Sequence, residues 1–458
     1  MLTIRGFSVK IKCINLKGGG LFLDGKSVGI YTLGCKVSQY ESGAVAEKFA
    51  KRGFSVLPFS ERCDVYVINT CTVTAESDRK CRQVIRRAIE KNPGAVVAVI
   101  GCYSQRDPEG VAKIPGVDIV FGTADKLLIV DKAIELLEEK TKGQIVKVDS
   151  LDGESFEAMT VTLSERTRAY VKIEDGCQCK CSYCAIAAAR GPVRSKPRMD
   201  VIREVEGLYH SGVQEIVLTG IETGSYGADF EEEYGLSDLI CELDERESCK
   251  RIRLGSLAPE LVGEGFAEKI KDTKILVPHF HISMQSGSDK ILRLMRRRYS
   301  RATAVKNIKR FKEIFPRAEF TTDLMVGFPG EDEADFLDTV SLVEEIGFLD
   351  AHVFAYSKRE GTDAAKMANQ VPESVKKERS RRLIEAKNLS RDKRLSEAVL
   401  CGAPLKCILE TFDGKGYISH SDEFFEVYTE AGANREGELV SVLPISHKDG
   451  IIFGEIIN

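Results

Sequence analysis

The sequence lacks any apolar run long enough to span a bilayer, and its charge is almost balanced, with 66 basic against 70 acidic side chains. The first absence predicts a chain without a transmembrane helix. The net charge of −4 excludes the broad positive surface of a general nucleic-acid binder, so any such contact must come from local patches. Residues 1–12 carry charges and no apolar stretch, which makes a poor signal peptide. We therefore expect a cytoplasmic chain with no membrane partner.

The composition is that of a globular protein. Its 458 residues are 43% hydrophobic and 30% charged, which predicts two or three domains with sizeable cores. There are 14 cysteines and no secretory signal. This combination indicates a reducing compartment, in which thiols serve metals or catalysis.

Three of these cysteines form a C-x-x-x-C-x-x-C motif after a strand-like run at 170–173. Cys177, Cys181 and Cys184 could hold three corners of a cubic iron–sulfur cluster. A 4Fe-4S cube usually takes four thiolates, so three leave one iron open to a substrate. Gly176 allows the loop to turn back. On spacing alone, a zinc knuckle or ordinary cysteines stay possible, and Cys179 inside the loop is a competing ligand.

A second set of cysteines follows predicted strands. Cys35, Cys71 and Cys102 each lie at the end of an apolar run, and Gly34 and Gly101 precede two of them. Open α/β sheets bind ligands beyond the carboxyl ends of their strands, so three neighbouring strand ends could gather these thiols. Three buried structural cysteines are the alternative.

The order of strand and helix patterns predicts an α/β protein. Residues 1–26 read as an extension of unknown role, and 27–150 as a parallel α/β domain with strands at 28–32, 65–69, 96–100 and 118–121. Residues 151–398 contain six further strands, too few for a full eight-stranded barrel, and end in a charged helical stretch at 373–400. These six strands are expected at 170–173, 215–218, 251–254, 279–283, 320–326 and 351–354. Residues 399–458, with turn signals at 413–414 and 448–450, predict a small antiparallel β-barrel.

Basic residues cluster in three places. The run at 293–301 contains five arginines, one tyrosine and no acid, so it offers phosphate pairing and base stacking, or else a solvated helix face. The other two clusters lie at 79–87 and 376–394. The carboxyl-terminal region has four bases against ten acids, so it cannot bind RNA by bulk charge.

The spacing of Cys177, Cys181 and Cys184 resembles that of the radical S-adenosylmethionine (SAM) superfamily. The runs LTG at 218–220, RLGS at 253–256, HISMQSGSD at 281–289 and GFPGE at 327–331 resemble barrel motifs of its methylthiotransferase branch. Upstream, TLGCKV at 32–37 and NTC at 69–71 resemble the amino-terminal domain of that branch. The resemblance covers nearly all of residues 28–458.

This resemblance implies a fold, two cofactors and a reaction. It implies a partial (β/α)6 radical SAM barrel between the amino-terminal domain and an RNA-associated TRAM-like β-barrel. One 4Fe-4S cluster would sit on Cys177, Cys181 and Cys184, and an auxiliary one on Cys35, Cys71 and Cys102. SAM bound at the open iron would be cleaved reductively to a radical, and a second SAM would methylate the sulfur that is then transferred. A low-potential electron donor and a sulfur donor are the implied partners.

Polar groups at strand ends are the candidates for SAM contacts, although such groups often only cap a strand. The candidate residues are Tyr183, Thr219, Gly220, Glu222, Ser283 and Gln285, with Gly327 leaving room. The candidates for contacts to the RNA backbone are Arg296, Arg297 and Arg298. No general base is assigned, because radical abstraction does not require one.

The substrate is suggested by KVSQYE at 36–41, directly after Cys35. This run looks like the group that modifies N6-threonylcarbamoyladenosine in tRNA next to the anticodon, with no DNA partner. The same chemistry on isopentenyladenosine tRNA or on a ribosomal protein is the alternative. Ser38 and the run at 187–189 depart from the pattern of the group, which leaves the exact pocket open. A non-catalytic iron–sulfur redox sensor that binds RNA, or a zinc-stabilised RNA-binding protein, would be hypotheses of another class.

Overall fold

The computed structural model describes residues 7–8, 25–138, 143–162, 167–263 and 265–457, so most of the predicted extension at 1–26 lies outside the described residues. The chain divides into two compact units. The first consists of Met1–Glu165, Tyr170–Cys179 and Cys184–Pro197, and the second of Arg166–Ala169, Lys180–Tyr183 and Arg198–Asn458. The predicted domain borders stay predictions, because this division follows spatial contacts and cuts across the predicted border at 150.

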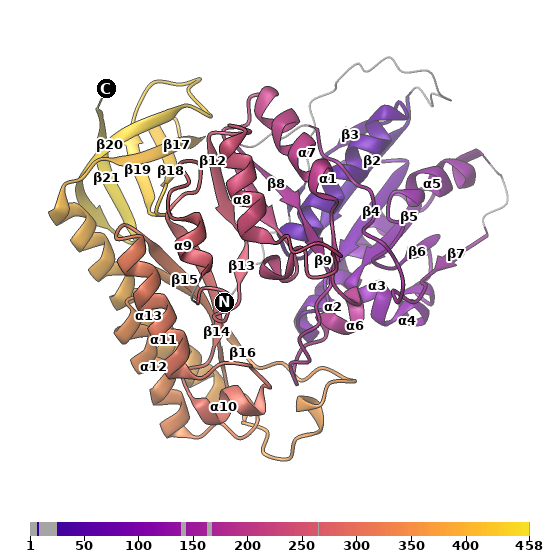
Figure 1. Cartoon of the computed structure of the whole chain (residues 1–458). Helices are drawn as coiled ribbons and strands as arrows, with labels where there is room; N and C mark the ends of the chain where they lie inside the picture. The colour runs from indigo at the N-terminus through magenta and orange to yellow at the C-terminus, as the bar shows by residue number, and fades with distance from the viewer. Residues whose placement is uncertain (1–6, 9–24, 139–142, 163–166, 264, 458) are drawn as a thin grey trace. The chain divides into compact units, whose positions relative to one another are not determined.

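A parallel sheet forms the centre of the first unit (Figure 1). Its strands run in the order β1-β2-β4-β5-β6-β7, with β3 beside β2, and every pair is parallel except β1 with β2. The strands are β1 (Phe7–Ser8), β2 (Ser27–Thr32), β3 (Ser55–Leu57), β4 (Val65–Thr70), β5 (Val96–Gly101), β6 (Ile119–Phe121) and β7 (Ile145–Lys147). The four strands predicted for this region are confirmed. Apolar residues predominate in them because both faces of the sheet are covered.

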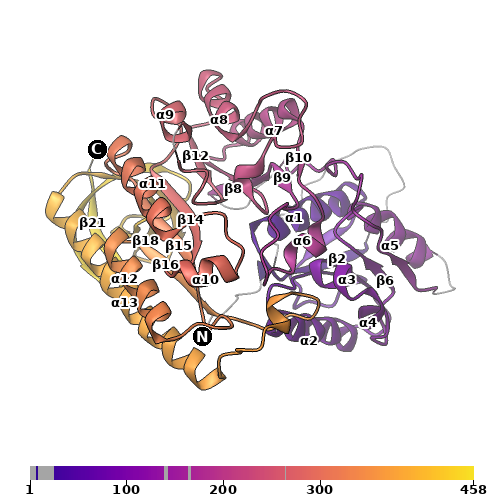
Figure 2. The same cartoon turned by 60° about the horizontal axis from the view of Figure 1, so that its bottom comes forward.

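Helices cover both faces of this sheet. Figure 2 shows α1 and α5 on one side and α2 and α4 on the other. The helices are α1 (Lys36–Lys51), α2 (Ala75–Lys91), α3 (Cys102–Arg106), α4 (Pro108–Ala112) and α5 (Leu128–Glu138). In α2 the buried residues Cys81, Val84, Ile85 and Ala88 recur at the spacing of one helix face. This helix begins after Thr74, whose Oγ1 accepts a hydrogen bond of 3.1 Å from the backbone N–H of Ser77.

The segment around the C-x-x-x-C-x-x-C motif contributes short elements to the first unit. β9 (Glu174–Asp175) pairs antiparallel with β10 (Arg194–Ser195), and α6 (Ile186–Arg190) lies between them in sequence. This pairing brings the chain before the motif loop next to the chain that follows α6.

Parallel strands and covering helices make up most of the second unit, as predicted. β11 pairs with β12, and β13, β14, β15 and β16 form a second parallel run. The strands are β11 (Glu215–Thr219), β12 (Arg251–Leu254), β13 (Ser256–Leu257), β14 (His279–Gln285), β15 (Glu319–Val326) and β16 (Asp350–Ala355). A further strand, β8 (Arg168–Lys172), has its first two residues in this unit and the others in the first unit. All six strands predicted for this region are present within two residues of their expected bounds.

The helices of this unit lie along its strands, and Figure 1 shows α11, α12 and α13 beside β14–β16. They are α7 (Arg198–His210), η1 (Thr223–Ser225), α8 (Leu236–Glu245), α9 (Phe266–Ile270), α10 (Asp289–Leu294), α11 (Arg301–Ile314), α12 (Glu333–Ile346), η2 (Ala364–Lys366) and α13 (Glu373–Cys401). Among the described residues, no helix combines the length and the apolar character that crossing a membrane demands.

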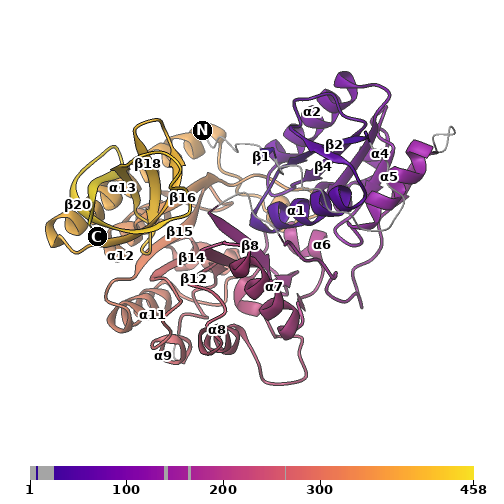
Figure 3. The same ribbon diagram turned by 90° about the horizontal axis from the view of Figure 1, so that it is seen from above.

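The carboxyl-terminal strands close into a five-stranded barrel, which packs against the end of α13 (Figure 3). Its strands are β17 (Leu405–Phe412), β18 (Gly416–Ser421), β19 (Glu426–Glu430), β20 (Leu439–Lys448) and β21 (Ile451–Ile457). The barrel predicted here is confirmed, but it is not wholly antiparallel, since β19 and β21 are parallel. A closed ring with an odd number of strands must contain at least one parallel pair.

Phe424 links this barrel to the parallel strands of the same unit. Its ring stacks on His279 at 4.4 Å and on His420 at 4.7 Å between centroids. The guanidinium groups of Arg253 and Arg168 lie 4.9 and 5.9 Å from its centre, within cation–π range. The backbone φ of Phe424 is +77°, a conformation that bulky residues seldom adopt, so packing holds it there.

A buried carboxylate lies beside this ring. Glu215 is within 3.2 Å of Arg168, 2.9 Å of Arg251 and 3.1 Å of Arg253, and we call these four residues the Glu215 cluster. Burial alone would raise the pKa of Glu215, but the three arginines outweigh burial and hold that pKa far below its usual range.

Acids of the carboxyl-terminal barrel complete the charge balance of this junction. Asp422 pairs with Arg251 at 3.0 Å, Glu410 pairs with Arg168, and Glu423 pairs with Arg317 at 2.5 Å. The acids of this domain thus serve in part to fix it to the strands that precede it.

Candidate functional site

Cys35, Cys71 and Cys102 lie at the carboxyl ends of three adjacent parallel strands, β2, β4 and β5. Burial, followed by the nearby thiols of Cys102 and Cys35, raises the pKa of Cys71 to about 12, so the three thiols are close enough to interact electrostatically. A Cβ placed on Gly34 would lie 3.4 Å from the Cβ of Cys71. The structure therefore gathers these three residues at one edge of the sheet.

Close backbone approach at this edge depends on Gly101. Its φ is +101°, and an added Cβ would lie 2.6 Å from Asn69 Oδ1 and 2.7 Å from the carbonyl oxygen of Thr70. Asn69 in turn donates from Nδ2 to the backbone oxygen of Ser38 at 3.0 Å, which fixes the start of α1. Only glycine fits where Cys102 leaves its strand.

The motif loop is shaped by backbone contacts within the first unit. Gly176 has φ +98°, and a Cβ there would lie 1.9 Å from the oxygen of Pro192. Two backbone N–H groups donate to motif sulfurs, from Cys179 to Cys177 Sγ at 3.4 Å and from Ile186 to Cys184 Sγ at 3.3 Å. Such donors orient sulfur ligands and tune a cluster bound to them. Cys179 thus contributes a backbone donor to Cys177.

The middle of the motif loop belongs to the second unit. Arg297 Nη1 donates to Cys181 Sγ at 3.4 Å, and Ser182 Oγ donates to the oxygen of Leu294 at 2.7 Å. The ring of Tyr183 meets Phe328 edge-on, with centroids 6.3 Å apart. Cys181 is therefore held against the segment that follows α10.

The chemistry of these sulfurs fits iron–sulfur clusters. Within the described residues, no group of three or more His, Cys, Asp or Glu side chains surrounds a point as a single metal ion would require. A cubane presents a different iron to each thiolate, so its ligands do not need to converge on one point. N–H and guanidinium donors aimed at sulfur suit an anionic cluster.

The predicted SAM contacts are spread over strand ends of the second unit. Thr219 ends β11, Gly220 follows it, and Glu222 precedes η1, while Ser283 and Gln285 lie in β14. Ser283 Oγ is 2.6 Å from Ser256 Oγ, which sequence reasoning did not single out. The signal for Ser256 was its place in the RLGS run.

Gly327 is closely packed on one side. Its φ is +71°, and a Cβ there would lie 2.3 Å from Cγ of Lys376 at the start of α13. Its N–H donates to Glu331 Oε1 at 2.8 Å, and Glu331 also accepts from Arg379. The room left by this glycine is therefore used by Lys376.

The run of arginines at 296–298 does not form one uniform face. α10 ends at Leu294, and Arg296 adopts a φ of +61°. Arg296 and Arg298 are exposed, whereas Arg297 turns inward to Cys181. Arg296 also pairs with Asp363 at 2.7 Å. This turn could not be predicted, because nothing in a run of identical residues marks a change of direction.

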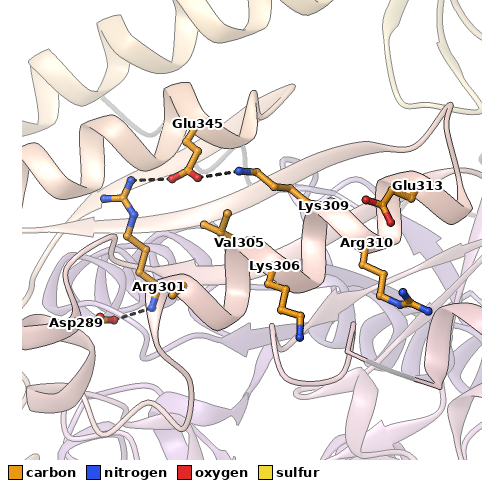
Figure 4. A pocket seen from close by; sticks show the side chains of 9 residues that line it. Asp289, Arg301, Val305, Lys306, Lys309, Arg310, Glu313 and Glu345 are labelled. Carbon is orange, nitrogen blue, oxygen red and sulfur yellow. Dashed lines mark hydrogen bonds and ion pairs between the residues drawn. The ribbon is translucent and has the colours of Figure 1, made fainter.

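A surface groove over α11 carries further charges (Figure 4). Arg301 and Lys309 reach Glu345 from its two sides, at 3.0 and 2.9 Å, whereas Lys306 points away from it. Most cations of this groove are therefore neutralised by carboxylates, and none of the predicted site residues lines it.

Two family models match the chain. The Radical SAM superfamily matches residues 171–343, and the Uncharacterized protein family UPF0004 matches residues 27–122. The two matches contain the two cysteine triplets respectively.

Several relatives match over nearly the whole chain. The Threonylcarbamoyladenosine tRNA methylthiotransferase MtaB of Bacillus subtilis is 39% identical over 421 residues, which cover 91% of this chain and 93% of the relative. The protein of the same name from Thermotoga maritima is 38% identical, covering 91% and 94%. The tRNA-2-methylthio-N(6)-dimethylallyladenosine synthase of Acetivibrio thermocellus is 32% identical, covering 93% and 90%.

Among solved structures, the radical S-adenosylmethionine methyltransferase TsrM from Kitasatospora setae superposes with a TM-score of 0.52 at 15% identity, covering 71% of this chain and 74% of that one. At this identity the likeness concerns the fold alone.

Proposed function

Because the chain belongs to the radical SAM methylthiotransferase family, we propose that it installs a 2-methylthio group on N6-threonylcarbamoyladenosine of tRNA, next to the anticodon. The observation that carries the proposal is the gathering of Cys35, Cys71 and Cys102 at three adjacent strand ends, in addition to the motif loop. Sulfur insertion requires a second site that carries sulfur, whereas radical generation requires only the radical SAM cluster. Relatives named for this modification support the choice of nucleoside, as does KVSQYE at 36–41.

Each cysteine triplet has a role in this proposal. Cys177, Cys181 and Cys184 hold the radical SAM cluster, and Cys35, Cys71 and Cys102 hold the auxiliary cluster. When bound, the clusters and SAM supply a low-potential electron, radical chemistry at carbon, and transferable sulfur and methyl groups. The chain itself orients the sulfurs, through the N–H donors of Cys179 and Ile186 and through Arg297.

SAM is proposed to lie over the strand ends of the second unit, near Tyr183, Thr219, Gly220, Glu222, Ser283 and Gln285. Gly327 shapes this end of the barrel by admitting Lys376. A low-potential electron donor and a sulfur donor are the further partners, and a tRNA substrate places the reaction in the cytoplasm.

The proposed RNA contacts are Arg296 and Arg298, which are exposed. Arg297 was predicted together with them, and its bond to Cys181 favours a role at the cluster instead. Losing one phosphate contact should flatten the dependence of log affinity on log salt by about one unit. We expect the R296A/R298A variant to lower the slope for tRNA. A control R203A/R246A variant, which removes two exposed, ion-paired arginines outside the three basic clusters, should not.

Nucleoside mass spectrometry of tRNA from cells with and without the protein tests the substrate. The expected result is 2-methylthio-threonylcarbamoyladenosine that appears only with the protein. If the methylthio group appeared on isopentenyladenosine instead, the nucleoside would be wrong and the reaction class would stand. Purified protein with intact clusters and no SAM cleavage under strong reductant would support the redox-sensor hypothesis.

Iron content tests the two cluster sites. Replacing Cys35, Cys71 and Cys102 together with Ala should halve the iron of the anaerobically reconstituted protein and spare SAM cleavage. The C241A/C401A variant is the control, because it removes two thiols outside both sites. An unchanged iron content in the triple variant would refute the auxiliary site.

A further inference from the structure

A group of buried charges lies inside the first unit, and the sequence analysis assigned no role to any single member, although Glu41 ends the run KVSQYE at 36–41. It consists of Arg190, Glu41, Asp175, Lys172 and Lys126, and we call it the Arg190 cluster. Each member is at most 3% exposed, and Arg190 is completely buried. Burying this many charges is costly unless every member is paired.

Arg190 is the centre of this cluster. Its guanidinium donates to Glu41 Oε2 at 3.2 Å and to Asp175 Oδ2 at 3.2 Å. Lys172 bridges the same two carboxylates at 3.0 and 2.6 Å, and Lys126 lies 3.2 Å from Glu41. The planar fork of arginine can satisfy several acceptors in one plane, which an ammonium group cannot do.

Another donor of Arg190 points at a cysteine. Its Nε–H donates to Cys102 Sγ at 3.2 Å, where both side chains are buried. The guanidinium group of arginine stays protonated even when it is buried. A permanent cation therefore lies against one sulfur of the proposed auxiliary site.

The cluster also connects the two cysteine triplets through the chain. Glu41 lies on α1, six residues after Cys35, and Asp175 lies two residues before Cys177. Arg190 itself ends α6, six residues after Cys184. One side chain thus holds a stem of the motif loop, the helix behind Cys35, and Cys102.

The Arg190 cluster has three basic members and two acidic ones. Arg194 lies 3.6 Å from Asp175, and Glu157 lies 3.9 Å from Lys126. Burial lowers the pKa of Lys126 and raises the pKa of Glu157, which shifts both groups towards their neutral forms. The cation that faces Cys102 is Arg190, which stays protonated.

We propose that Arg190 is a positioning residue of the auxiliary cluster, which holds Cys102 in place and raises the reduction potential of the cluster bound there. One-electron reduction by the low-potential donor adds one negative charge to the cluster. A neighbouring cation that donates a hydrogen bond to a ligand sulfur stabilises this charge. The inference rests on the auxiliary site assigned under "Proposed function".

The test measures the reduction potential of the auxiliary cluster alone. The full chain carries Ala at Cys177, Cys181 and Cys184, so that only the auxiliary cluster reports in an EPR-monitored redox titration. R190K keeps the positive charge and loses the planar guanidinium group that donates to Cys102 and to the two carboxylates. R190Q/E41Q removes one charge of each sign, and so avoids leaving a buried carboxylate unpaired. R194Q is the control, because Arg194 pairs with Asp175 and contacts no cysteine.

We expect R190Q/E41Q to lower the equilibrium constant for reduction at least tenfold, which is about 59 mV for one electron. R190K should give a smaller shift, and R194Q the smallest. With the motif cysteines intact, the double variant should lose auxiliary iron before iron of the radical SAM cluster.

Two outcomes would overturn the inference. One is a double variant with full auxiliary iron whose potential matches that of R194Q. The other is loss of both clusters together in R190K and R190Q/E41Q, which would assign Arg190 to folding of the unit. A parent protein that binds no iron once Cys177, Cys181 and Cys184 are replaced would instead refute the auxiliary site of the proposed function.

Discussion

Replacing Glu215 with Gln removes a carboxylate that three arginines share, two of them buried and Arg168 partly so, with nitrogen–oxygen distances of 2.9 to 3.2 Å. Glutamine fills the same space but leaves the arginines with one anion fewer. Breaking a buried ion pair by removing one partner costs about 3–5 kcal/mol. At about 2–4 °C per kcal/mol, we expect the melting temperature at pH 7 to fall by roughly 10 °C.

The pH dependence gives this prediction a second test. The arginines hold the pKa of Glu215 in the folded protein below its unfolded value of about 4.3. The stability that Glu215 contributes is therefore fully present above pH 4.3, and is lost as pH falls towards the folded pKa. The difference in unfolding free energy between wild type and E215Q should decrease as the pH is lowered from 5 to 3.

The assays are thermal denaturation of the full chain at pH 7 and urea denaturation at several pH values, both followed by circular dichroism. E436Q is the matched control, because Glu436 is an exposed acid of the carboxyl-terminal barrel, and it should change stability by less than about 0.5 kcal/mol. Equal unfolding midpoints for E215Q and E436Q at pH 7 would refute the reasoning. A difference in unfolding free energy between wild type and E215Q that grows at acid pH would refute it too.

Three further outcomes follow from local geometry. C179S should keep the radical SAM cluster and SAM cleavage, because Cys179 serves through its backbone N–H, whereas C177S should lose that cluster and SAM cleavage and keep the auxiliary cluster; iron content and absorbance spectra decide this. G414A should lower the unfolding free energy by about 1–2 kcal/mol, because of its positive φ alone. G327A should lower it further, because its Cβ would also meet the side chain of Lys376. Equal losses of unfolding free energy in the two variants would contradict this. T74A removes the N-cap of α2 and should cost about 1 kcal/mol in the same assay.

The strands could be predicted because apolar runs and their spacing reflect burial on both faces of a parallel sheet. The gathering of Cys71 and Cys102 could be predicted too. Both residues directly follow such runs, and the carboxyl ends of neighbouring parallel strands meet at one edge. The local apolar pattern and the general topology of parallel sheets were sufficient to predict that these two cysteines lie together.

The Arg190 cluster could not be predicted in this way. Glu41, Asp175 and Arg190 are separated by up to 149 residues, and no periodicity links them. The available signal was the charged stretch at 172–175, which interrupts an apolar strand and marks a buried polar site. The inward turn of Arg297 was equally hidden, because it depends on the positive φ of the residue before it.

The docking of the carboxyl-terminal barrel has a consequence for truncation experiments. Its ten acids suggest a domain that repels RNA, yet Glu410, Asp422 and Glu423 are paired with arginines that precede the barrel in the chain. A chain cut after Gly402 would expose Arg168 and Arg253. It would also expose the apolar residues Leu349 and Leu395, which pack against the barrel. Such a fragment would bind any polyanion more tightly than the intact chain, and its new affinity would reflect an exposed docking surface and not a physiological RNA site.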